Sequence, residues 1–252
     1  MLCNTIQKRN MRTRIAGAVL IIGTALLLVI PIYASTYYHA DSRAEALQEE
    51  LLEESKMEWK TDYAILRPDK SRDNQIGIIF YPGGLVENQS YLPLMNRFRE
   101  EGYTCVLLRM PFHLAIFDLQ GAGYAMPDLK SEGVERWYLS GHSLGGVAAQ
   151  NCYRKHPEDY AGLILMGSYL TKDGTSPEQV LTIYGSNDQV MKRDRVTDKN
   201  STIVELKGGN HGQFGDYGPQ AGDGKPGITR EEQQNQTVNI VIRDIKGNKT
   251  SK

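Results

Sequence analysis

Short apolar runs alternate with longer amphipathic segments along most of the chain. Runs such as those at residues 76–81 and 180–184 have no polar face, so helices should cover such strands on both sides. We expect strands at Ile76–Tyr81, Thr104–Met110, Arg136–Ser140, Gly162–Met166, Val180–Tyr184 and Thr202–Leu206, and helices at Ser90–Glu101, Ser143–His156 and Thr229–Ile245. This alternation is typical of strand–helix–strand units, and it predicts an α/β fold with a doubly wound, mainly parallel sheet and helices on both faces.

An apolar segment, residues 15–33, precedes this pattern and carries no charge over its 19 residues. A helix of that length, at about 1.5 Å per residue, crosses a hydrocarbon core of roughly 30 Å. Basic residues precede the segment and mostly acidic residues follow it, which places residues 1–14 in the cytoplasm. We therefore expect a single-pass transmembrane anchor with the remaining chain outside the cytoplasm. A cleaved signal peptide, which would release a secreted protein, is the alternative.

The rest of the chain divides into three parts. Residues 34–56 include Ala44, Leu47 and Leu51 at helical spacing among acidic residues, which predicts a stem helix. Residues 57–246 are enough for one domain with its own core, whose first strand is expected between Met57 and Leu66. Residues 247–252 form a short C-terminal tail.

Charge and cysteine content exclude several classes of function. The chain has 29 basic and 30 acidic residues and a formal net charge of −1, so it lacks the basic excess of nucleic-acid-binding proteins. Its three cysteines form no CxxC pair. We expect no nucleic-acid partner, no metal and no cofactor.

The segment Gly141–Gly145 has the pattern G-x-S-x-G around Ser143. It follows an expected strand directly and precedes an expected helix, which is the context that a nucleophile elbow requires. A serine on such a sharp turn has strained backbone geometry, and the glycines allow strand and helix to approach. Ser143 is therefore the candidate nucleophile, and a purely structural glycine turn is the alternative.

A serine nucleophile needs a base, and the base needs an acid that fixes its tautomer. His211 follows the last expected strand in a glycine-rich loop, and Asp188 follows the strand at residues 180–184. The chain order Ser143, Asp188, His211 is the order found in α/β-hydrolase triads. Asp194 and Asp198 are the alternative acids.

Four segments together resemble successive landmarks of the alpha/beta-hydrolase superfamily, and most of all its compact, lidless branch of dienelactone-hydrolase-like proteins. They are Phe80–Val86, Gly141–Gly146, Tyr184–Asp188 and Gly208–Gly212. The resemblance implies that the site lies at the carboxyl ends of the parallel strands. Only about a dozen residues separate Met166 from Val180, where larger relatives insert a lid, so we expect an open site.

The resemblance also implies an oxyanion hole, in which backbone N–H groups bind the negative charge of a tetrahedral intermediate. One donor would be Leu144, the residue after the nucleophile, and the other either Gly84 or Leu85. Pro82 has no N–H and cannot donate. Candidates for the substrate pocket are His113, His142, Phe214 and Tyr217. For the two aromatic residues Phe214 and Tyr217, ordinary packing of their loop onto the domain is the alternative.

These observations predict a membrane-anchored serine hydrolase that cleaves a carboxylic ester or thioester through an acyl-enzyme. Its partner would be a small-molecule ester or acyl substrate. An acyltransferase on the same fold, which passes the acyl group to an alcohol, is one alternative. A catalytically inactive binding protein is the other, and the complete set of three catalytic residue types argues against it.

Overall fold

The computed structural model describes residues 14–21, 23–25, 27, 29, 32–33, 36–171, 179–196 and 201–247. The chain divides into two compact units, residues 1–36 and residues 37–252. In the first unit, residues 14–21 are helical. The expected membrane segment, residues 15–33, lies partly outside the described residues, and among the described ones no helix has the length and apolar character to cross a membrane.

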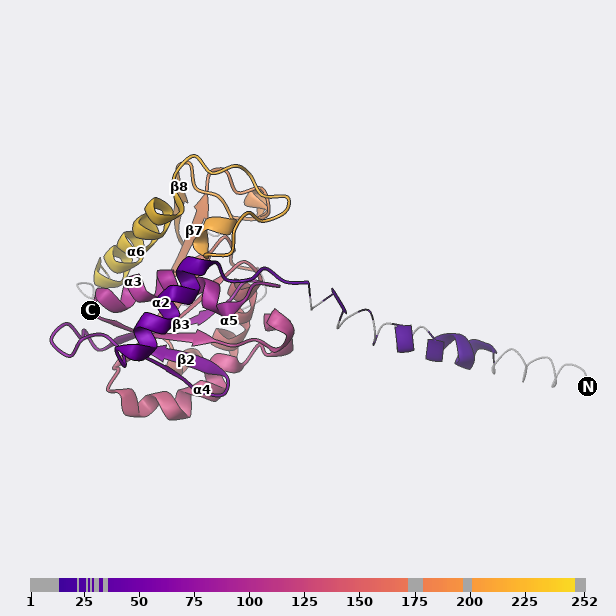
Figure 1. Ribbon diagram of the computed structural model, residues 1–252, viewed down its shortest axis with the longest axis horizontal. Coiled ribbons are helices and arrows are strands. Elements are labelled where there is room, and N and C mark those ends of the chain that lie inside the picture. Colours follow the sequence, from indigo (N-terminus) through magenta and orange to yellow (C-terminus); the bar gives the residue numbers. More distant parts are fainter. Residues whose placement is uncertain are drawn as a thin grey trace, which may run out of the picture. The chain divides into compact units, whose positions relative to one another are not determined.

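The second unit is built on an eight-stranded sheet with the strand order β1-β2-β4-β3-β5-β6-β7-β8 (Figure 1). The strands are β1 (Met57–Trp59), β2 (Tyr63–Leu66), β3 (Ile76–Tyr81), β4 (Tyr103–Leu108), β5 (Arg136–His142), β6 (Gly162–Met166), β7 (Val180–Gly185) and β8 (Thr202–Leu206). Strands β3 to β8 are parallel, whereas β2 is antiparallel to β4 and β1 is antiparallel to β2. The mainly parallel sheet is confirmed.

Helices cover both faces of the sheet, as expected. One face packs against α2 (Ser42–Glu53), α3 (Leu92–Glu100) and α6 (Arg230–Gly247), and the other against α4 (Gly121–Leu129) and α5 (Leu144–Lys155). Short 3-10 helices lie in the connections: η1 (Asn88–Tyr91), η2 (Pro111–His113), η3 (Ala115–Phe117), η4 (Lys130–Glu132), η5 (Pro157–Asp159), η6 (Arg193–Arg195) and η7 (Gly212–Phe214). Along β3, Ile78 and Phe80 face the first layer while Ile79 and Tyr81 face the second. Burial on both sides explains why this strand has no polar face.

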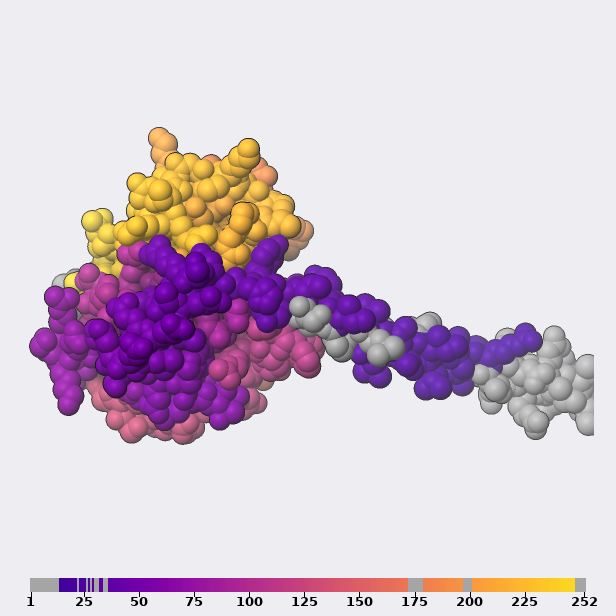
Figure 2. All heavy atoms as spheres, viewed as in Figure 1, coloured from indigo at the N-terminus to yellow at the C-terminus, as the bar shows by residue number. Residues whose placement is uncertain are grey.

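The helix expected within residues 34–56 is present as α2, but it packs into the second unit instead of forming a separate stem. Ala44 and Leu51 are fully buried, and Leu51 belongs to the core that α3 and α6 share. Arg230, at the start of α6, also donates a hydrogen bond to the carboxylate of Asp41. Figure 2 shows the indigo atoms of this segment against the yellow C-terminal atoms. The apolar stripe that suggested a stem is the packing face of a domain helix.

Two further elements differ from the expected pattern. The strand expected between Met57 and Leu66 is a hairpin, because the chain turns between β1 and β2 and pairs Met57 with Leu66. Helix α4 has no counterpart among the expected helices. The parallel arrangement nevertheless brings the segments that follow β3, β5, β7 and β8 to one edge of the sheet, where the candidate catalytic residues lie.

Candidate active site

Ser143 lies on the turn between β5 and α5, as the elbow pattern predicts. Its backbone has φ 53° and ψ −120°, a conformation that a residue with a side chain rarely adopts. Its N–H donates to the carbonyl of Met166 on the neighbouring strand at 2.9 Å, which holds the turn in place. Backbone strain of this kind persists where the surrounding structure imposes it, and it is concentrated at functional sites.

The two glycines of the pattern are required by close backbone contacts. A Cβ atom on Gly141 would lie 2.4 Å from the carbonyl group of Gly145. A Cβ atom on Gly145 would lie 2.1 Å from the carbonyl oxygen of Tyr81, on β3. Strand β5, helix α5 and strand β3 can therefore approach each other only if both positions lack side chains.

Asp188 and His211 form a buried pair, although 23 residues separate them in the sequence. Asp188 Oδ2 lies 2.8 Å from His211 Nδ1, and the side chains are 0% and 1% exposed. Asp188 Oδ1 accepts hydrogen bonds from the N–H groups of Val190 at 2.9 Å and Met191 at 2.8 Å. With Nδ1–H bound to the carboxylate, the lone pair of His211 lies on Nε2. This is the tautomer that can accept a proton from a serine.

The alternative acids are not placed like Asp188. Asp194 is exposed and lies in η6, after the loop that contains Asp188. Asp198 lies outside the described residues. Among the described residues, Asp188 is thus the carboxylate that contacts His211.

Ser143 and His211 line one cavity of about 310 Å³, which brings the candidate nucleophile and base to a shared space. The other lining residues are Leu144, Val147, Gly167, Ser168, Tyr169, Thr171, Val190, Met191, Lys192 and Arg195. The motifs do not predict most of these residues. They can be identified only from their position in the fold, because they lie on α5 or follow β6 and β7 at the carboxyl ends of the strands.

Of the two alternatives for the second oxyanion donor, the geometry favours Gly84. The N–H of Leu85 already donates to the carbonyl of His113 at 2.7 Å. The N–H of Gly84 has no such partner in the described part of the chain, and a Cβ atom on Gly84 would lie 3.0 Å from the side chain of Leu144. Leu144 begins α5, so its own N–H has no partner within the helix. These two N–H groups are therefore available on neighbouring segments.

The four expected pocket residues are not among those that line this cavity. Phe214 and Tyr217 are buried in the core under α6, which explains why aromatic residues occupy this loop. His113 is half-buried and stacks on Tyr37 with ring centroids 3.8 Å apart. Burial lowers the pKa of His113. His142 is 1% exposed, contacts Tyr91, and its ring centroid lies 4.5 Å from that of His211.

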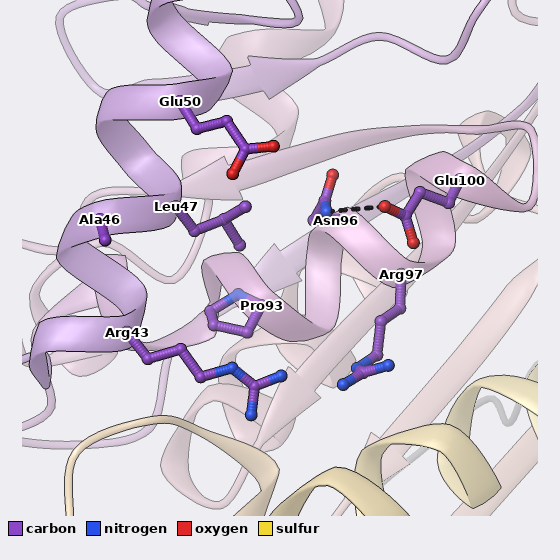
Figure 3. A pocket seen from close by; sticks show the side chains of 8 residues that line it. All are labelled: Arg43, Ala46, Leu47, Glu50, Pro93, Asn96, Arg97 and Glu100. Carbon is purple, nitrogen blue, oxygen red and sulfur yellow. Dashed lines mark hydrogen bonds between the residues drawn. The ribbon is translucent and has the colours of Figure 1, made fainter.

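A second cavity, of about 370 Å³, lies between α2 and α3 (Figure 3). Its lining carries two arginines and two glutamates, and Asn96 Nδ2 donates to Glu100 at 3.1 Å along the α3 wall. The lining residues are Arg43, Ala46, Leu47, Glu50, Pro93, Asn96, Arg97 and Glu100. This cavity contains no candidate nucleophile or base, so the smaller cavity at Ser143 is the candidate active site.

One group of side chains has the composition of a metal site. The ligand atoms of His156, Glu158 and Asp159 lie within 4.8 Å of one another after α5. All three are at least partly exposed, and exposed acidic groups gather in this way without a metal. None of them lines the cavity at Ser143.

Comparison with known proteins agrees with this geometry. Residues 77–235 match the alpha/beta hydrolase family. Pyrethroid hydrolase from Sphingobium wenxiniae is 33% identical over 66 residues, which are 26% of this chain and 24% of that protein. The match thus covers about a quarter of the length of this curated relative.

Solved structures of similar fold cover most of the chain. Est1E from Butyrivibrio proteoclasticus has a TM-score of 0.54 at 14% identity, over 75% of this chain and 97% of that one. Est1E with bound ferulic acid gives 0.55 at 13% identity, over 73% and 95%. A serine hydrolase without a lid from Xanthomonas campestris gives 0.52 at 15% identity, over 72% and 88%. With the fold and the family match in agreement, this chain belongs to the alpha/beta hydrolase family.

Proposed function

We propose that this alpha/beta hydrolase is a serine esterase that cleaves carboxylic esters or thioesters through an acyl-enzyme intermediate. The observation that carries the proposal is the buried Asp188–His211 pair, whose imidazole shares a cavity with the strained Ser143. In a hydrolase of this fold, that arrangement supplies an acid, a base and a nucleophile in three distinct roles.

In the first half-reaction His211 Nε2 accepts the proton of Ser143 as Oγ attacks the carbonyl carbon of the substrate. The carbonyl oxygen becomes an oxyanion, which the N–H groups of Leu144 and Gly84 bind. Asp188 stabilises the imidazolium without taking its proton. The intermediate then collapses, the bond to the alcohol or thiol breaks, and the leaving group takes the proton from His211.

The second half-reaction repeats these steps with water. His211 accepts a proton from water, whose oxygen attacks the acyl carbon and forms a second oxyanion. When this intermediate collapses, Ser143 Oγ leaves and regains a proton from His211. The carboxylic acid is released and the enzyme returns to its starting state.

The shape and lining of the cavity bear on the substrate. Leu144, Val147, Val190 and Met191 supply an apolar wall around Ser143. Only residues 167–179 connect β6 and β7, so the chain has no room there for a lid domain. Such a site suits small esters with an apolar acyl or alcohol group. Feruloyl and pyrethroid esters are useful first probes, given the ferulic acid bound to Est1E and the activity named for the Sphingobium protein.

Labelling of the nucleophile tests the proposal. A serine activated by a base attacks phosphorus electrophiles, so a fluorophosphonate probe should label Ser143 in the full chain. The Ser143→Ala variant should lose both labelling and turnover of chromogenic esters. Peptide mapping of the labelled protein and a chain-length series of esters provide the measurements.

A matched control is Ser168→Ala, because Ser168 lines the same cavity but does not follow the elbow pattern. This variant should still be labelled. Full ester turnover by Ser143→Ala, or labelling at another serine, would show that the elbow does not carry the nucleophile.

We also propose that residues 15–33 anchor the protein in a membrane with the hydrolase domain outside the cytoplasm. The support is the uncharged length of this segment, with Lys8, Arg9, Arg12 and Arg14 before it and mostly acidic residues after it.

Protease treatment of intact cells tests this placement. The full-length protein should remain in the membrane fraction, and external protease should remove the hydrolase domain. Recovery of a soluble protein that begins near Ser35 or Asp41 would instead indicate a cleaved signal peptide.

A further inference from the structure

A buried pair of polar side chains, Tyr91 and His142, lies beside the candidate site and has no role in the mechanism above. Tyr91 lies in η1 and His142 is the last residue of β5. Tyr91 Oη is 2.8 Å from His142 Nδ1, and the N–H of Gly83 donates to the same oxygen at 3.1 Å. The Tyr91 hydroxyl thereby joins the loop after β3 to the residue directly before Ser143.

These hydrogen bonds define the positions of the protons. Gly83 N–H can only donate, so Tyr91 Oη accepts from it, and His142 Nδ1 is the acceptor within reach of the hydroxyl proton among the described residues. We therefore assign this proton to the bond with His142 Nδ1, which is then unprotonated. Burial, together with the charge of the neighbouring His211, holds the pKa of His142 well below its ordinary range. Burial raises the pKa of Tyr91, so its hydroxyl keeps its proton. Both groups are neutral near pH 7, which favours a positional role over proton transfer.

The loop that Gly83 belongs to packs tightly against this pair. A Cβ atom on Gly83 would lie 2.7 Å from Tyr91 Oη and 2.9 Å from His142 Nδ1. On the other side of Gly84, the N–H of Leu85 donates to the carbonyl of His113. Hydrogen bonds of its two neighbours thus hold the Gly84 peptide, whose own N–H has no partner within the described residues.

The same pair also contacts the candidate base. The rings of His142 and His211 lie 4.5 Å apart between centroids, and the ring of Phe214 lies 5.4 Å from His142. A Cβ atom on Gly167 would lie 2.9 Å from His211 Nδ1 and 3.2 Å from His142 Nε2, so both imidazoles pack against this glycine. A displacement of His142 would therefore affect the oxyanion loop and the base together.

We propose that Tyr91 is a positioning residue for the oxyanion hole. Its hydroxyl holds Gly83, and through it the N–H of Gly84, at the place where negative charge develops, and it fixes the His142 ring against His211. This inference rests on the proposed serine hydrolase function. Preorganised donors matter most in the transition state, so loss of the Tyr91 hydroxyl should affect kcat more than KM.

The test is the Tyr91→Phe variant of the full chain, which keeps the ring and removes the oxygen. With a soluble chromogenic ester, kcat should fall by about 10- to 100-fold, less than for loss of a whole donor, while KM changes by less than about 3-fold. A trifluoromethyl ketone forms a tetrahedral adduct when Ser143 Oγ bonds to its carbonyl carbon and the carbonyl oxygen becomes an oxyanion. Its inhibition constant should rise by the same factor as kcat/KM falls.

Tyr138→Phe is the matched control. Tyr138 is a buried tyrosine on β5, the strand that ends at His142, and its hydroxyl donates to Gln179 at 3.3 Å, away from the carboxyl edge. This variant should keep the wild-type kcat and the wild-type inhibition constant. Thermal unfolding of both variants separates a loss of stability from a loss of positioning.

Two results would overturn the inference while leaving the proposed function intact. One is a Tyr91→Phe variant with wild-type kcat, and the other is an equal loss in Tyr91→Phe and Tyr138→Phe. If the wild-type chain hydrolyses no ester, or if Ser143→Ala is fully active, the proposed function itself fails.

Discussion

Among single residues, the contrast between Asp188 and Asp194 shows how the surroundings assign a role to one of two similar carboxylates. Asp188 is 1% exposed, accepts two backbone N–H groups and contacts His211. Asp194 lies six residues later and is exposed. The buried carboxylate orients an imidazole, and the exposed one contributes only surface charge.

In the Asp188→Asn variant, an amide replaces the carboxylate that orients His211. The Asn oxygen can accept the N–H groups of Val190 and Met191, which leaves its NH₂ group facing His211 Nδ1. The imidazole would then carry its proton on Nε2 and could not accept one from Ser143. We expect kcat to fall by up to about 10⁴-fold while the protein stays folded.

Steady-state kinetics with one ester checks this prediction, and Asp194→Asn serves as the control. The control should retain wild-type kcat. If Asp194→Asn were inactive and Asp188→Asn active, the acid in the mechanism would have to be reassigned.

The candidate catalytic residues could be identified from the sequence because each lies next to a distinctive local pattern. Ser143 lies between two glycines that backbone contacts require, and His211 follows the last strand. The role of Tyr91 could not be predicted in this way. Its partners Gly83 and His142 lie 8 and 51 residues away, and only the packing of η1 on the sheet brings them together.

At the scale of elements, continuous apolar runs predicted the strands well. The expected bounds of β3, β6 and β8 agree with the structure, and those of β4, β5 and β7 differ by one or two residues. Strands β3 to β7 are buried on both faces, which explains their continuous apolar composition, and β8 lies at the edge of the sheet. Helices α3, α5 and α6 begin and end close to the expected residues for a similar reason, because their buried positions recur at helical spacing.

Helix α4 illustrates what the pattern could not predict. Gly121, Gly123 and Pro127 all disfavour a helix, and the intrinsic propensity of the segment is low. The helix forms because Ala125 and Leu129, on the same face as Gly121, are buried in the core that it shares with α5. Tertiary packing overrides local propensity here, and a single sequence does not reveal that packing.

The walls of the candidate cavity were unpredictable for a different reason. Apart from the residues on α5, they come from segments after β6 and β7, which have no common motif and are adjacent only because the two strands pair. Phe214 and Tyr217 were expected there because they are aromatic residues in a long loop. Their burial in the core, which removes apolar surface from water, explains better why aromatic residues occur at these two positions.

At the scale of the whole molecule, the buried His142 beside the candidate site makes the stability of the folded protein depend on pH. Burial, and then the neighbouring His211, lowers the pKa of His142, and its ring contacts Tyr91, Phe214 and the Asp188-bound His211. The folded protein therefore keeps this imidazole neutral, while the unfolded chain takes up a proton below about pH 6.5. The unfolded state then binds more protons than the folded state, and acid favours unfolding.

The sign and size of the effect follow from this difference. The stability that His142 contributes is fully present above its unfolded pKa, and it is lost as the pH falls from about 6.5 toward its lower folded value. Each group of this kind can change the free energy of unfolding by at most about 1.4 kcal/mol per pH unit. Between pH 7.5 and 5.5 the wild-type protein should lose about 1 kcal/mol through His142. Urea unfolding of the full chain in detergent solution at both pH values measures this loss.

The His142→Gln variant isolates the contribution of this residue, because glutamine has no proton to gain in this range and its side-chain oxygen can still accept from the Tyr91 hydroxyl. Its loss of stability between the two pH values should be smaller than that of the wild type by about 1 kcal/mol, whatever its stability at pH 7.5. An equal loss in His142→Gln and the wild type would mean that the folded protein does not hold His142 neutral, and the proton arrangement inferred for Tyr91 and His142 would then be wrong.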